Sequence, residues 1–250
     1  MTWVDSHCHP QLAEASAQEL IDRAVEVDWM VVPGVDVATS EAALDLAERN
    51  PLRVVAAVGL HPNEASKWEV EARRIEELAQ KAVAVGEIGL DFYRDHTPRE
   101  RQIPVFAAQL QLAKRLNKPA IIHCRDAFSE VHRLVEESEL GPLAVMHCWT
   151  GGPKWTRRFL DLGVTFGFAG PIAFETGDTI RRAAAEVPID RGMVETDTPY
   201  LSPPPYRDLE NEPSRVSLVG AALAEVWDIT VEETAAATSE NATRVFGGPK

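Results

Sequence analysis

Short apolar runs alternate with amphipathic stretches along almost the whole chain. Eight of these runs have the length and composition of buried strands. They span residues 2–5, 29–33, 53–59, 82–87, 120–123, 144–147, 164–168 and 192–195. Stretches with helical spacing separate them, and after residue 97 the apolar residues Ile103, Phe106, Leu110 and Ala113 recur on one face. Strands that alternate with helices are joined by crossovers, so the pattern predicts a parallel α/β protein.

Several of the expected helices carry start and stop signals. A serine or threonine followed three residues later by glutamate, the capping-box pattern, occurs at 66–69, 97–100 and 230–233. Pro98 adds a residue type that favours the first helical position. Asp126 is expected to cap a helix that runs to Val135, and Gly163 stands where a glycine would end the helix before it. These signals place helices between the expected strands.

The number of strands decides the fold class. Eight strands in about 200 residues, followed by two helices, predict an α/β fold of the (β/α)8 TIM-barrel type with extra C-terminal helices. A doubly wound open sheet is the alternative, but it would carry a glycine-rich loop where this chain has His7-Cys8-His9. No linker or repeat interrupts the chain, so we expect one domain over residues 1–250. The proline-rich segment 202–206 is expected to form a rigid loop over the barrel mouth.

The composition is that of an ordinary globular protein, with 45% hydrophobic and 26% charged residues. No apolar run approaches the ~18 residues of a membrane span. The N-terminus also lacks the regions of a secretion signal, so we expect a cytoplasmic location. Cys8, Cys124 and Cys148 have no disulfide-like spacing, which fits a reducing compartment. Each adjoins a histidine, and strand alternation predicts small buried thiols that face away from the imidazoles.

The net charge of −14 limits how the protein could hold nucleic acid. This charge argues against a broad basic surface that binds the phosphate backbone by counterion release. A DNA or nucleotide substrate would therefore be held locally, by metal ions and a few arginines. The sequence predicts neither membrane contact nor an oligomer.

The first candidate for chemistry is His7-Cys8-His9, at the end of the first apolar run. Side chains alternate along a strand, so His7 and His9 are expected to point the same way and Cys8 the other way. Two imidazoles that converge at a strand end have a metal-binding geometry. The pair alone could equally be two histidines of the core or the surface.

Further histidines and carboxylates stand at the ends of later runs. They are His61, Glu87, His123, His147 and Asp197. The C-terminal ends of all strands in a parallel barrel open onto one face, so these residues are expected to meet. Five of the seven histidines lie at this edge, which a core-packing role would not predict. Any one of these residues alone would more often be an ordinary hydrogen-bonded group, but together they predict a metal site.

The residue types suit a pair of divalent cations. Imidazoles and carboxylates bind zinc or manganese, while phosphoryl chemistry often uses magnesium. Glu87, which is expected to close the fourth strand, has two oxygens and can bridge two ions about 3.5–4 Å apart. Asp197 can ligate an ion and accept the proton of an activated water. Glu87 and Asp197 are therefore the expected catalytic carboxylates.

These residues lie in motifs that closely resemble those of the TatD family of metal-dependent hydrolases, among the amidohydrolase-like barrels. The matching segments are 5–9, 59–62, 86–91, 122–127, 147–152, 195–201, 211–213 and 241–246. The resemblance implies a barrel that binds two divalent cations and allows a third. It implies that His7, His9, Glu87 and Asp197 ligate one ion, and that Glu87, His123 and His147 ligate the other. It also implies deoxyribonuclease activity at DNA ends, while a few TatD-like proteins clear D-amino acids from transfer RNA.

The chain departs from the family pattern in two places. Trp149 and Thr150 stand where phenylalanine and serine are usual, which keeps the bulk and the hydroxyl. The segment 206–213 retains Arg207 but has a negative net charge, where many relatives carry basic residues near Leu209 and Glu210. The second departure weakens the expectation of tight polynucleotide binding and leaves metal-dependent hydrolysis intact.

The expected activity is hydrolysis of a phosphodiester, most simply by a deoxyribonuclease of the 3′-5′ exonuclease type. Arg125 and Arg207 are the candidate phosphate contacts, with surface ion pairs as the alternative. His61 is expected to donate a hydrogen bond to the substrate or a proton to the leaving group. Trp68, Phe92, Trp149 and Trp155 could stack on bases, although simple packing explains them equally well.

Two other functions remain open from the sequence. One is an ester or amide hydrolase on the same metals, for example an enzyme that resembles a D-aminoacyl-tRNA deacylase, which the acidic segment 206–213 favours. The other is a non-catalytic metalloprotein. A non-catalytic role predicts that a metal ligand or the catalytic base has been lost. The sequence retains all six candidate ligands, including Asp197 as the candidate base.

Overall fold

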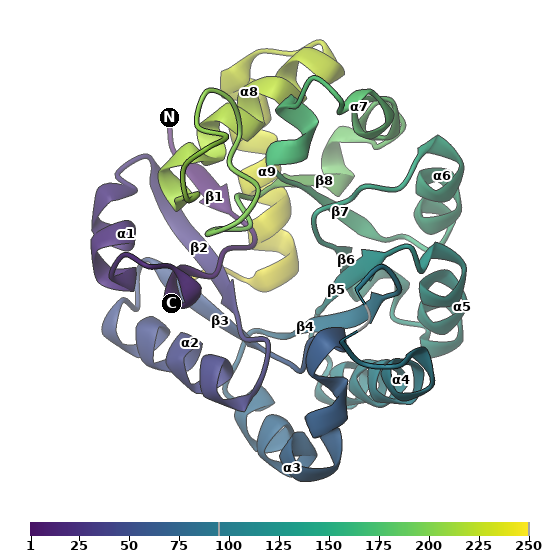
Figure 1. Cartoon of the computed structure of the whole chain (residues 1–250). Coiled ribbons are helices and arrows are strands. Elements are labelled where there is room, and N and C mark those ends of the chain that lie inside the picture. The colour runs from purple at the N-terminus through teal and green to yellow at the C-terminus, as the bar shows by residue number, and fades with distance from the viewer. Residues whose placement is uncertain (95, 250) are drawn as a thin grey trace.

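A computed structural model describes residues 1–94 and 96–249 and contains the expected parallel barrel (Figure 1). Its eight strands pair in the order of the sequence, each parallel to the next. They are β1 (Trp3–Asp5), β2 (Val27–Pro33), β3 (Val54–Val58), β4 (Ala84–Asp91), β5 (Ala120–Arg125), β6 (Ala144–Met146), β7 (Thr165–Phe168) and β8 (Gly192–Val194). All eight expected strands are present, with boundaries shifted by up to four residues. The (β/α)8 prediction is confirmed.

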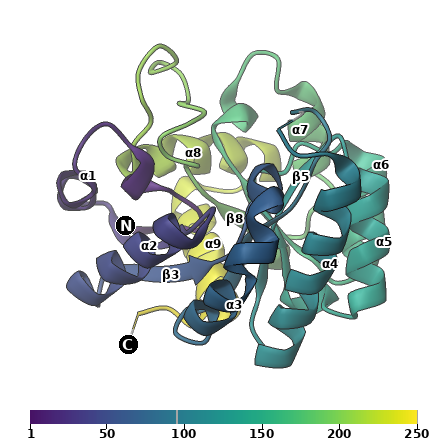
Figure 2. The ribbon, with the colours of Figure 1, turned by 60° about the horizontal axis from the view of Figure 1, so that its bottom comes forward.

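Helices α1 to α7 connect successive strands around the barrel, and α8 and α9 follow the last strand (Figures 1 and 2). They are α1 (Ala17–Arg23), α2 (Val37–Arg49), α3 (Trp68–Ala79), α4 (Arg99–Leu116), α5 (Phe128–Ser138), α6 (Pro153–Asp161), α7 (Asp178–Ala184), α8 (Val216–Trp227) and α9 (Val231–Phe246). Short 3₁₀ segments are η1 (Pro10–Leu12), η2 (Pro62–Lys67), η3 (Gly141–Leu143), η4 (Gly170–Ala173), η5 (Ile189–Arg191) and η6 (Pro213–Arg215). Within the described residues, none of these helices is long and apolar enough to cross a membrane.

The predicted start and stop signals hold in part. Thr230 forms the expected capping box with Glu233, and Gly163, at φ +83°, follows the end of α6 as expected. The capping boxes predicted at 66–69 and 97–100 do not form, because the residues before α3 and α4 make no side-chain capping bond. Thr97 instead donates its hydroxyl to the carbonyl of Asn63 at 2.8 Å, so tertiary contact overrides the local motif. Asp126 also fails as a cap, because α5 begins after Ala127 without a side-chain bond.

The seam between β1 and β8 is closed just beyond the ends of the two strands. The backbone N–H of Ser6 donates to the carbonyl of Val194 at 3.0 Å. The backbone N–H and the hydroxyl of Thr196 both donate to the Asp5 carboxylate, at 2.9 and 2.6 Å. Burial raises the pKa of Asp5 to about 7, although the hydrogen bonds from Thr196 act in the opposite direction. Side chains thus join the first strand to the last at the end that faces the mouth.

The barrel interior is a packed apolar layer that α9 closes from below. Strand residues such as Val31, Ile121 and Met193 fill it, together with Ala242 and Phe246 of α9. The amide of Asn241 donates to the carbonyls of Ile189 and Gly192, both at 2.8 Å, and fixes α9 to the lower end of β8. Because the lower end is sealed in this way, any open site must lie at the opposite, C-terminal end of the strands.

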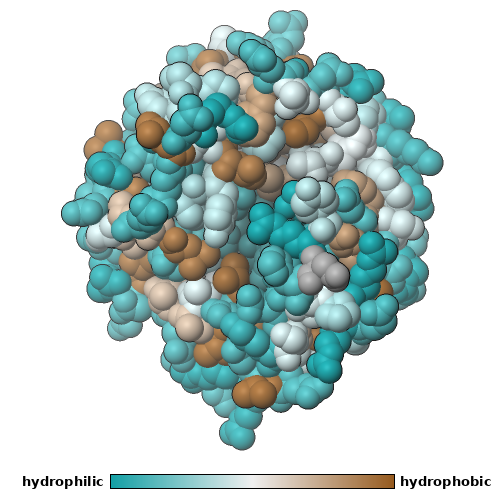
Figure 3. Space-filling model, in the orientation of Figure 1, coloured by the Kyte–Doolittle hydropathy of each residue, from teal (hydrophilic) through white to brown (hydrophobic). Residues whose placement is uncertain are grey.

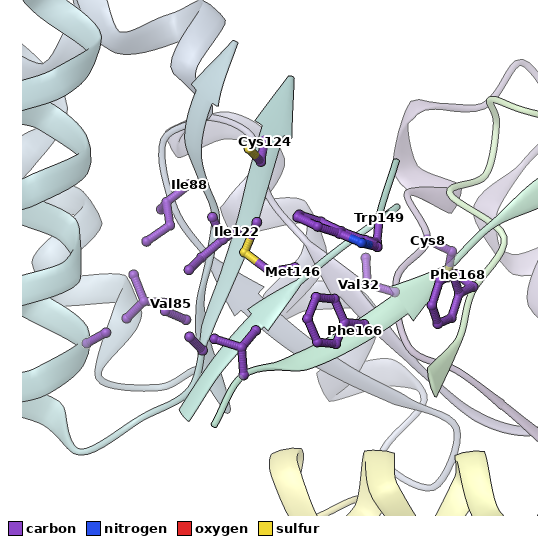
Figure 4. Packing of buried hydrophobic residues seen from close by; sticks show 14 of the residues in the cluster. Cys8, Val32, Val85, Ile88, Ile122, Cys124, Met146, Trp149, Phe166 and Phe168 are labelled. Atoms are coloured by element: carbon purple, nitrogen blue, oxygen red, sulfur yellow. The ribbon is translucent and has the colours of Figure 1, made fainter. Parts of the chain in front are cut away.

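A second apolar layer lies between the strands and the outer helices (Figure 4). Trp149 is 2% exposed, packs edge-on against Phe159 and Phe166, and donates its indole N–H to the Thr156 hydroxyl at 2.9 Å. Trp155 is partly buried and stacks on Phe128. The indole rings of Trp149 and Trp155 therefore both pack against other aromatic side chains. The expectation that Trp149 could stack on a base is therefore wrong, and the packing alternative holds for it.

Candidate metal centre

The C-terminal ends of the strands open into a cavity of about 640 Å³. The space-filling view in Figure 3 looks onto a face of the molecule that is mostly hydrophilic, with hydrophobic residues scattered over it. The walls include His9, His61, Glu87, His123, His147 and Asp197. His7 is fully buried next to His9, so all six expected ligands gather in one place. Tyr200 and Leu201 also line the cavity, and they precede the proline-rich segment that was expected to cover the mouth.

His7 and His9 converge as expected, but strand alternation is not the cause. Their Nε2 atoms lie 3.0 Å apart, although β1 already ends at Asp5. The segment is held by two backbone bonds, from the N–H of Cys8 to the carbonyl of Val31 at 3.1 Å and from the N–H of His9 to the carbonyl of Thr198 at 2.7 Å. Strand β2 on one side and the segment after β8 on the other therefore fix the segment that carries the two imidazoles.

Glu87 lies inside β4 rather than at its end, which corrects the sequence prediction. The strand continues to Asp91, and its pairing with β5 shifts register between Val85 and Ile88. Such an irregularity re-aims a side chain out of the regular pleat. Gly86 makes the close approach possible, because a Cβ there would lie 2.6 Å from Cβ of Ile121. The Glu87 carboxylate thereby faces the cavity floor and is 3% exposed.

The two oxygens of Glu87 face two different sets of imidazoles. Oε2 lies 3.3 Å from His9 Nε2 and 3.5 Å from His7 Nε2. Oε1 lies 2.9 Å from His123 Nδ1 and 3.0 Å from His147 Nε2. A single carboxylate therefore stands between two groups of nitrogen ligands, which is the arrangement of a carboxylate that bridges two cations.

The hydrogen bonds of His9 and His147 test whether cations fit this arrangement. His9 Nδ1 donates to the carbonyl of Pro33 at 2.9 Å, and His147 Nδ1 donates to Glu195 Oε1 at 3.1 Å. With Nδ1 protonated, the Nε2 atom of each neutral ring carries a lone pair. Each lone pair then faces an oxygen of Glu87, which also only accepts. Two acceptors hold this geometry when a proton or a metal cation lies between them, and this set of imidazole nitrogens and carboxylate oxygens fits a metal centre.

Asp197 completes the set on the side of His7 and His9. Its Oδ1 lies 3.8 Å from the Nε2 atoms of both histidines. Asp197 has φ +56°, and its N–H donates to the carbonyl of His7 at 2.9 Å, so the seam between the first and last strands positions this carboxylate. Burial raises the pKa of Asp197 to about 6. A nearby cation favours the ionised form instead.

The charges at the centre are strongly interdependent. Burial alone would raise the pKa of Glu87, but the charge of His147 and the hydrogen bonds from His123 and His147 hold it well below its usual range. Burial alone would lower the pKa of His147, but Glu87 and Glu195 hold it well above its usual range. Burial and the charge of His147 lower the pKa of His7 to about 4. The carboxylates thus favour positive charge near His147, which is the electrostatic condition for binding a cation.

His61 differs from the other imidazoles in its tautomer. Its Nδ1 accepts the backbone N–H of Asn63 at 3.1 Å, so a neutral ring must carry its proton on Nε2. That Nε2 lies 3.5 Å from Glu87 Oε1 at the cavity wall. Burial lowers the pKa of His61 to about 3, which keeps the ring neutral. Although His61, Glu87 and His123 lie close enough to hold an ion, His61 presents an N–H donor there rather than a lone pair.

Two carboxylates that the sequence analysis did not single out support the ligands from behind. Asp91 Oδ2 lies 3.5 Å from His123 Nε2, and its Oδ1 accepts the backbone N–H groups of Tyr93 and Arg94 at 2.9 Å. Glu195 accepts the bond from His147 described above. Asp91 lies in segment 86–91 together with Glu87, and Glu195 lies in segment 195–201 together with Asp197. Their place in these motifs is the sequence signal by which they could have been identified.

The structure separates the two arginines that were expected to contact phosphate. Arg125 lines the cavity, with its guanidinium 4.0 Å from the centre of the Tyr93 ring. Arg207 instead stacks on Phe174 at 3.5 Å and is not among the residues that line the cavity. Arg94, which the sequence analysis missed, lines the cavity beside Arg125. Among the residues described, neither Arg94 nor Arg125 forms an ion pair with a carboxylate.

The cysteines follow the prediction in part. Cys8 is fully buried in the apolar core, as expected. Cys148 is only partly buried and lines the cavity together with His147, so the prediction that it faces away is wrong. Cys124 also borders the cavity, but most of its side chain is buried in the core and only 9% is exposed. The physical reason for Cys148 is that β6 ends at Met146, and Cys148 has φ +43°, so strand alternation does not apply there.

Comparison with known proteins gives matches over almost the whole chain. The family model described as TatD related DNase matches residues 4–247. A Bacillus subtilis protein named as the uncharacterized metal-dependent hydrolase YabD is 37% identical over 250 residues, which cover 97% of this chain and 98% of that protein. A Rahnella protein named 3′-5′ ssDNA/RNA exonuclease TatD is 39% identical over 197 residues, covering 76% and 73% of the two chains. The crystal structure of YJJV, a TatD homolog from Escherichia coli, matches with a TM-score of 0.89 at 30% identity, covering 99% and 98% of the two chains.

Proposed function

The chain belongs to the TatD family of metal-dependent hydrolases, and we propose that it cleaves phosphodiester bonds of DNA at a centre of two divalent cations. The observation that carries this proposal is the position of Glu87. Its two oxygens face separate groups of imidazoles, at 3.3 and 3.5 Å on one side and at 2.9 and 3.0 Å on the other. Dinuclear centres of this kind serve phosphoryl transfer because they contact both the attacking and the leaving oxygen.

The distances support a division of the candidate ligands between two ions. His7, His9, Asp197 and Glu87 would hold the first ion, and we call this the first ion site. His123, His147 and Glu87 would hold the second ion, and we call this the second ion site. Nitrogen ligands favour zinc or manganese, and magnesium is the third candidate because phosphoryl chemistry often uses it.

The residues around the two sites take defined roles in hydrolysis. Bound cations would supply Lewis-acid polarisation of a phosphoryl oxygen and activation of a water. Asp197, at the first ion site, accepts the proton of the attacking water. His61 is neutral, so it presents its Nε2–H to the cavity as a hydrogen-bond donor to the substrate. Attack of the water on phosphorus breaks the bond to the leaving oxygen, and the proton accepted by Asp197 passes to that oxygen to give the product alcohol.

Arg125 and Arg94 are the candidate contacts for a substrate phosphate. Both line the cavity, and guanidinium groups match the geometry of phosphate oxygens. The net charge of −14 means that attraction of a polyanion depends on such local groups and on the ions. The 3′-5′ ssDNA/RNA exonuclease name of the Rahnella relative supports an end-directed reaction on a single strand.

A substrate panel tests the proposed activity. Purified protein is incubated with Mg²⁺, Mn²⁺ or Zn²⁺ and with single-stranded DNA labelled at the 5′ end, at the 3′ end or internally. We expect stepwise loss of the 3′ nucleotide, no release in the presence of a chelator, and recovery when the metal is restored. Hydrolysis of carboxylic esters or amides without any cleavage of DNA would overturn the proposal.

The second candidate function is hydrolysis of a carboxylic ester or amide on the same ions, including an aminoacyl-tRNA ester. One feature favours it: the segment 206–213 beside the mouth carries the exposed acids Asp208 and Glu210. The metals can polarise a carbonyl oxygen as they do a phosphoryl oxygen. Adding D-aminoacyl-tRNA and a set of simple esters to the panel separates this function from the first.

The cellular setting is also part of the proposal. We propose that the protein acts in the cytoplasm as a single barrel domain over residues 1–250. The three unpaired thiols, Cys8, Cys124 and Cys148, support a reducing compartment.

The two arginines give a prediction with a built-in control. Arg125→Ala is expected to raise the KM for DNA about 10-fold or more, because it removes a charged hydrogen-bond donor from the cavity wall, worth about 1.5–3 kcal/mol. Arg207→Ala makes the same substitution at a residue that stacks on Phe174 and does not line the cavity. It should change the KM for DNA less than about 2-fold. Steady-state kinetics on a short oligonucleotide measure both. An equal effect of the two variants, or a larger effect of Arg207→Ala, would contradict the assignment.

A further inference from the structure

The Glu195 carboxylate connects the structural elements that carry the two ion sites. Its Oε1 accepts the Nδ1–H of His147 at 3.1 Å and the backbone N–H of Cys148 at 2.6 Å. Its Oε2 lies 3.1 Å from the hydroxyl of Ser6, the residue that precedes His7. One side chain from the end of β8 therefore contacts both the second ion site and the segment that carries the first.

The barrel wall is shaped to hold this carboxylate. Glu195 is 0% exposed, and β7 passes directly behind it. A Cβ at Gly167 of β7 would lie 2.1 Å from Glu195 Oε2, so the strand has room for the carboxylate only because residue 167 is glycine. An ionised group is costly to bury unless its hydrogen bonds and partner charges compensate for the lost water. The three contacts above supply that compensation.

We propose that Glu195 is a positioning residue that sets the affinity of the second ion site by holding His147 with Nε2 unprotonated and by raising the basicity of its ring. The proposal rests on the dinuclear centre proposed above. Carboxylates that accept the distal N–H of a ligating histidine fix its tautomer and strengthen it as a ligand, and their loss costs about 10–100-fold in metal affinity. The effect should fall on one ion, because only His147 among the ligands bonds to Glu195.

The first ion site receives a different kind of support. His9 donates its Nδ1–H to the neutral carbonyl of Pro33, not to a carboxylate. On this side the hydrogen bond of Glu195, within the described part of the chain, is the one with the Ser6 hydroxyl, which also lies 3.1 Å from the carbonyl of Val194 and can donate there instead. Loss of the charge on Glu195 therefore leaves the first ion site with its own hydrogen bonds intact.

Glu195→Gln separates charge from shape. The glutamine oxygen can still accept from His147 and Cys148, and its amide can donate to Ser6 while the serine hydroxyl donates to Val194. The variant should fold and keep the orientation of His147, and it removes only the negative charge. Glu195→Ala leaves the donors of His147 and Cys148 without a partner, so it should lower the melting temperature as well.

The test measures the two metal affinities separately, by calorimetric titration of metal-free protein with Mn²⁺. For Glu195→Gln we expect one of two ions to bind about 10–100-fold more weakly and the other to keep its affinity. DNA cleavage should fall at low Mn²⁺ and recover at high Mn²⁺, with the KM for DNA unchanged. Asn241→Ala is the control, because it removes two buried hydrogen bonds from the sealed end of the barrel. It should lower the melting temperature and leave both affinities unchanged.

Two outcomes would overturn the inference. One is unchanged affinity for both ions in Glu195→Gln. The other is equal weakening of both ions, which would indicate a general structural role. A wild-type protein that binds only one ion would contradict the dinuclear centre instead, and the effect of Glu195→Gln on that ion would still decide the role of Glu195. The titration needs no substrate, so failure to cleave DNA leaves its result valid.

Discussion

Glu87→Gln is expected to reduce kcat/KM by at least about 10³-fold, which corresponds to about 4 kcal/mol of lost transition-state stabilisation. The substitution keeps the volume of the side chain but replaces one of its two oxygens with an amide NH₂, which donates hydrogen bonds and does not ligate a cation. One of the two groups of imidazoles around Glu87 then loses its shared ligand. Because Lewis-acid stabilisation by each cation is worth several kcal/mol, loss of the bridge removes most of the activity.

Glu64→Gln is the matched control for this variant. Glu64 also lines the cavity, but its carboxylate pairs with Lys67 at 2.7 Å and not with an imidazole. The control should keep its activity within about 3-fold, because a partly exposed ion pair contributes little. Circular dichroism and thermal melting confirm that both variants are folded. Near-wild-type hydrolysis by Glu87→Gln would mean that the two ions are not bridged by this residue.

Asp197→Asn is expected to lower kcat by about 10²–10⁴-fold and leave the fold intact. Asparagine has nearly the same shape and tolerates the left-handed backbone that residue 197 adopts, with φ +56°. The amide cannot accept the proton of the attacking water, and it is a weaker ligand than the carboxylate that faces His7 and His9 at 3.8 Å. The loss should therefore appear mainly in kcat, with a smaller effect on the affinity of the first ion site.

Single-turnover hydrolysis at saturating metal measures the effect of Asp197→Asn on the chemical step. Asp208→Asn makes the same change on an exposed residue of the segment 206–213 and should leave kcat unchanged. Unchanged hydrolysis by Asp197→Asn would refute the role of this carboxylate as the base, whatever the metal content of the variant.

The sequence was sufficient to predict the barrel, and the gathering of the six candidate ligands at one end of it, for one physical reason. In a parallel barrel every strand ends on the same face, so residues such as His7, His123 and His147 meet even though they are far apart in the chain. The alternation of strands and helices, which is visible in the hydrophobic pattern, determines that geometry. Once the fold class is known, residues at the ends of different strands can therefore be predicted to form one site.

Other features could not be predicted because they depend on backbone geometry and hydrogen bonds that the hydrophobic pattern does not specify. The register shift that places Glu87 within β4 and aims it into the cavity arises from its pairing with β5. The positive φ of Cys148 turns its thiol toward the cavity, where strand alternation predicted the opposite. The tautomer of His61 follows from one bond to a backbone N–H two residues away. No local pattern of hydrophobicity or capping contains this information.

The two arginines illustrate the same limit on the surface. Arg125 is the last residue of β5, two residues after His123, so the strand carries it to the mouth. Arg207 lies in an irregular segment, where the sequence does not specify which way a side chain turns, and it stacks on Phe174. The direction of the Arg207 side chain is therefore set by its contact with Phe174 and not by a local sequence pattern.

Anomalous scattering from crystals grown with Mn²⁺ or Zn²⁺ tests the central claim most directly. The account predicts two peaks about 3.5–4 Å apart on either side of Glu87, the first among His7, His9 and Asp197 and the second between His123 and His147. A single peak, or peaks outside this group of residues, would contradict it.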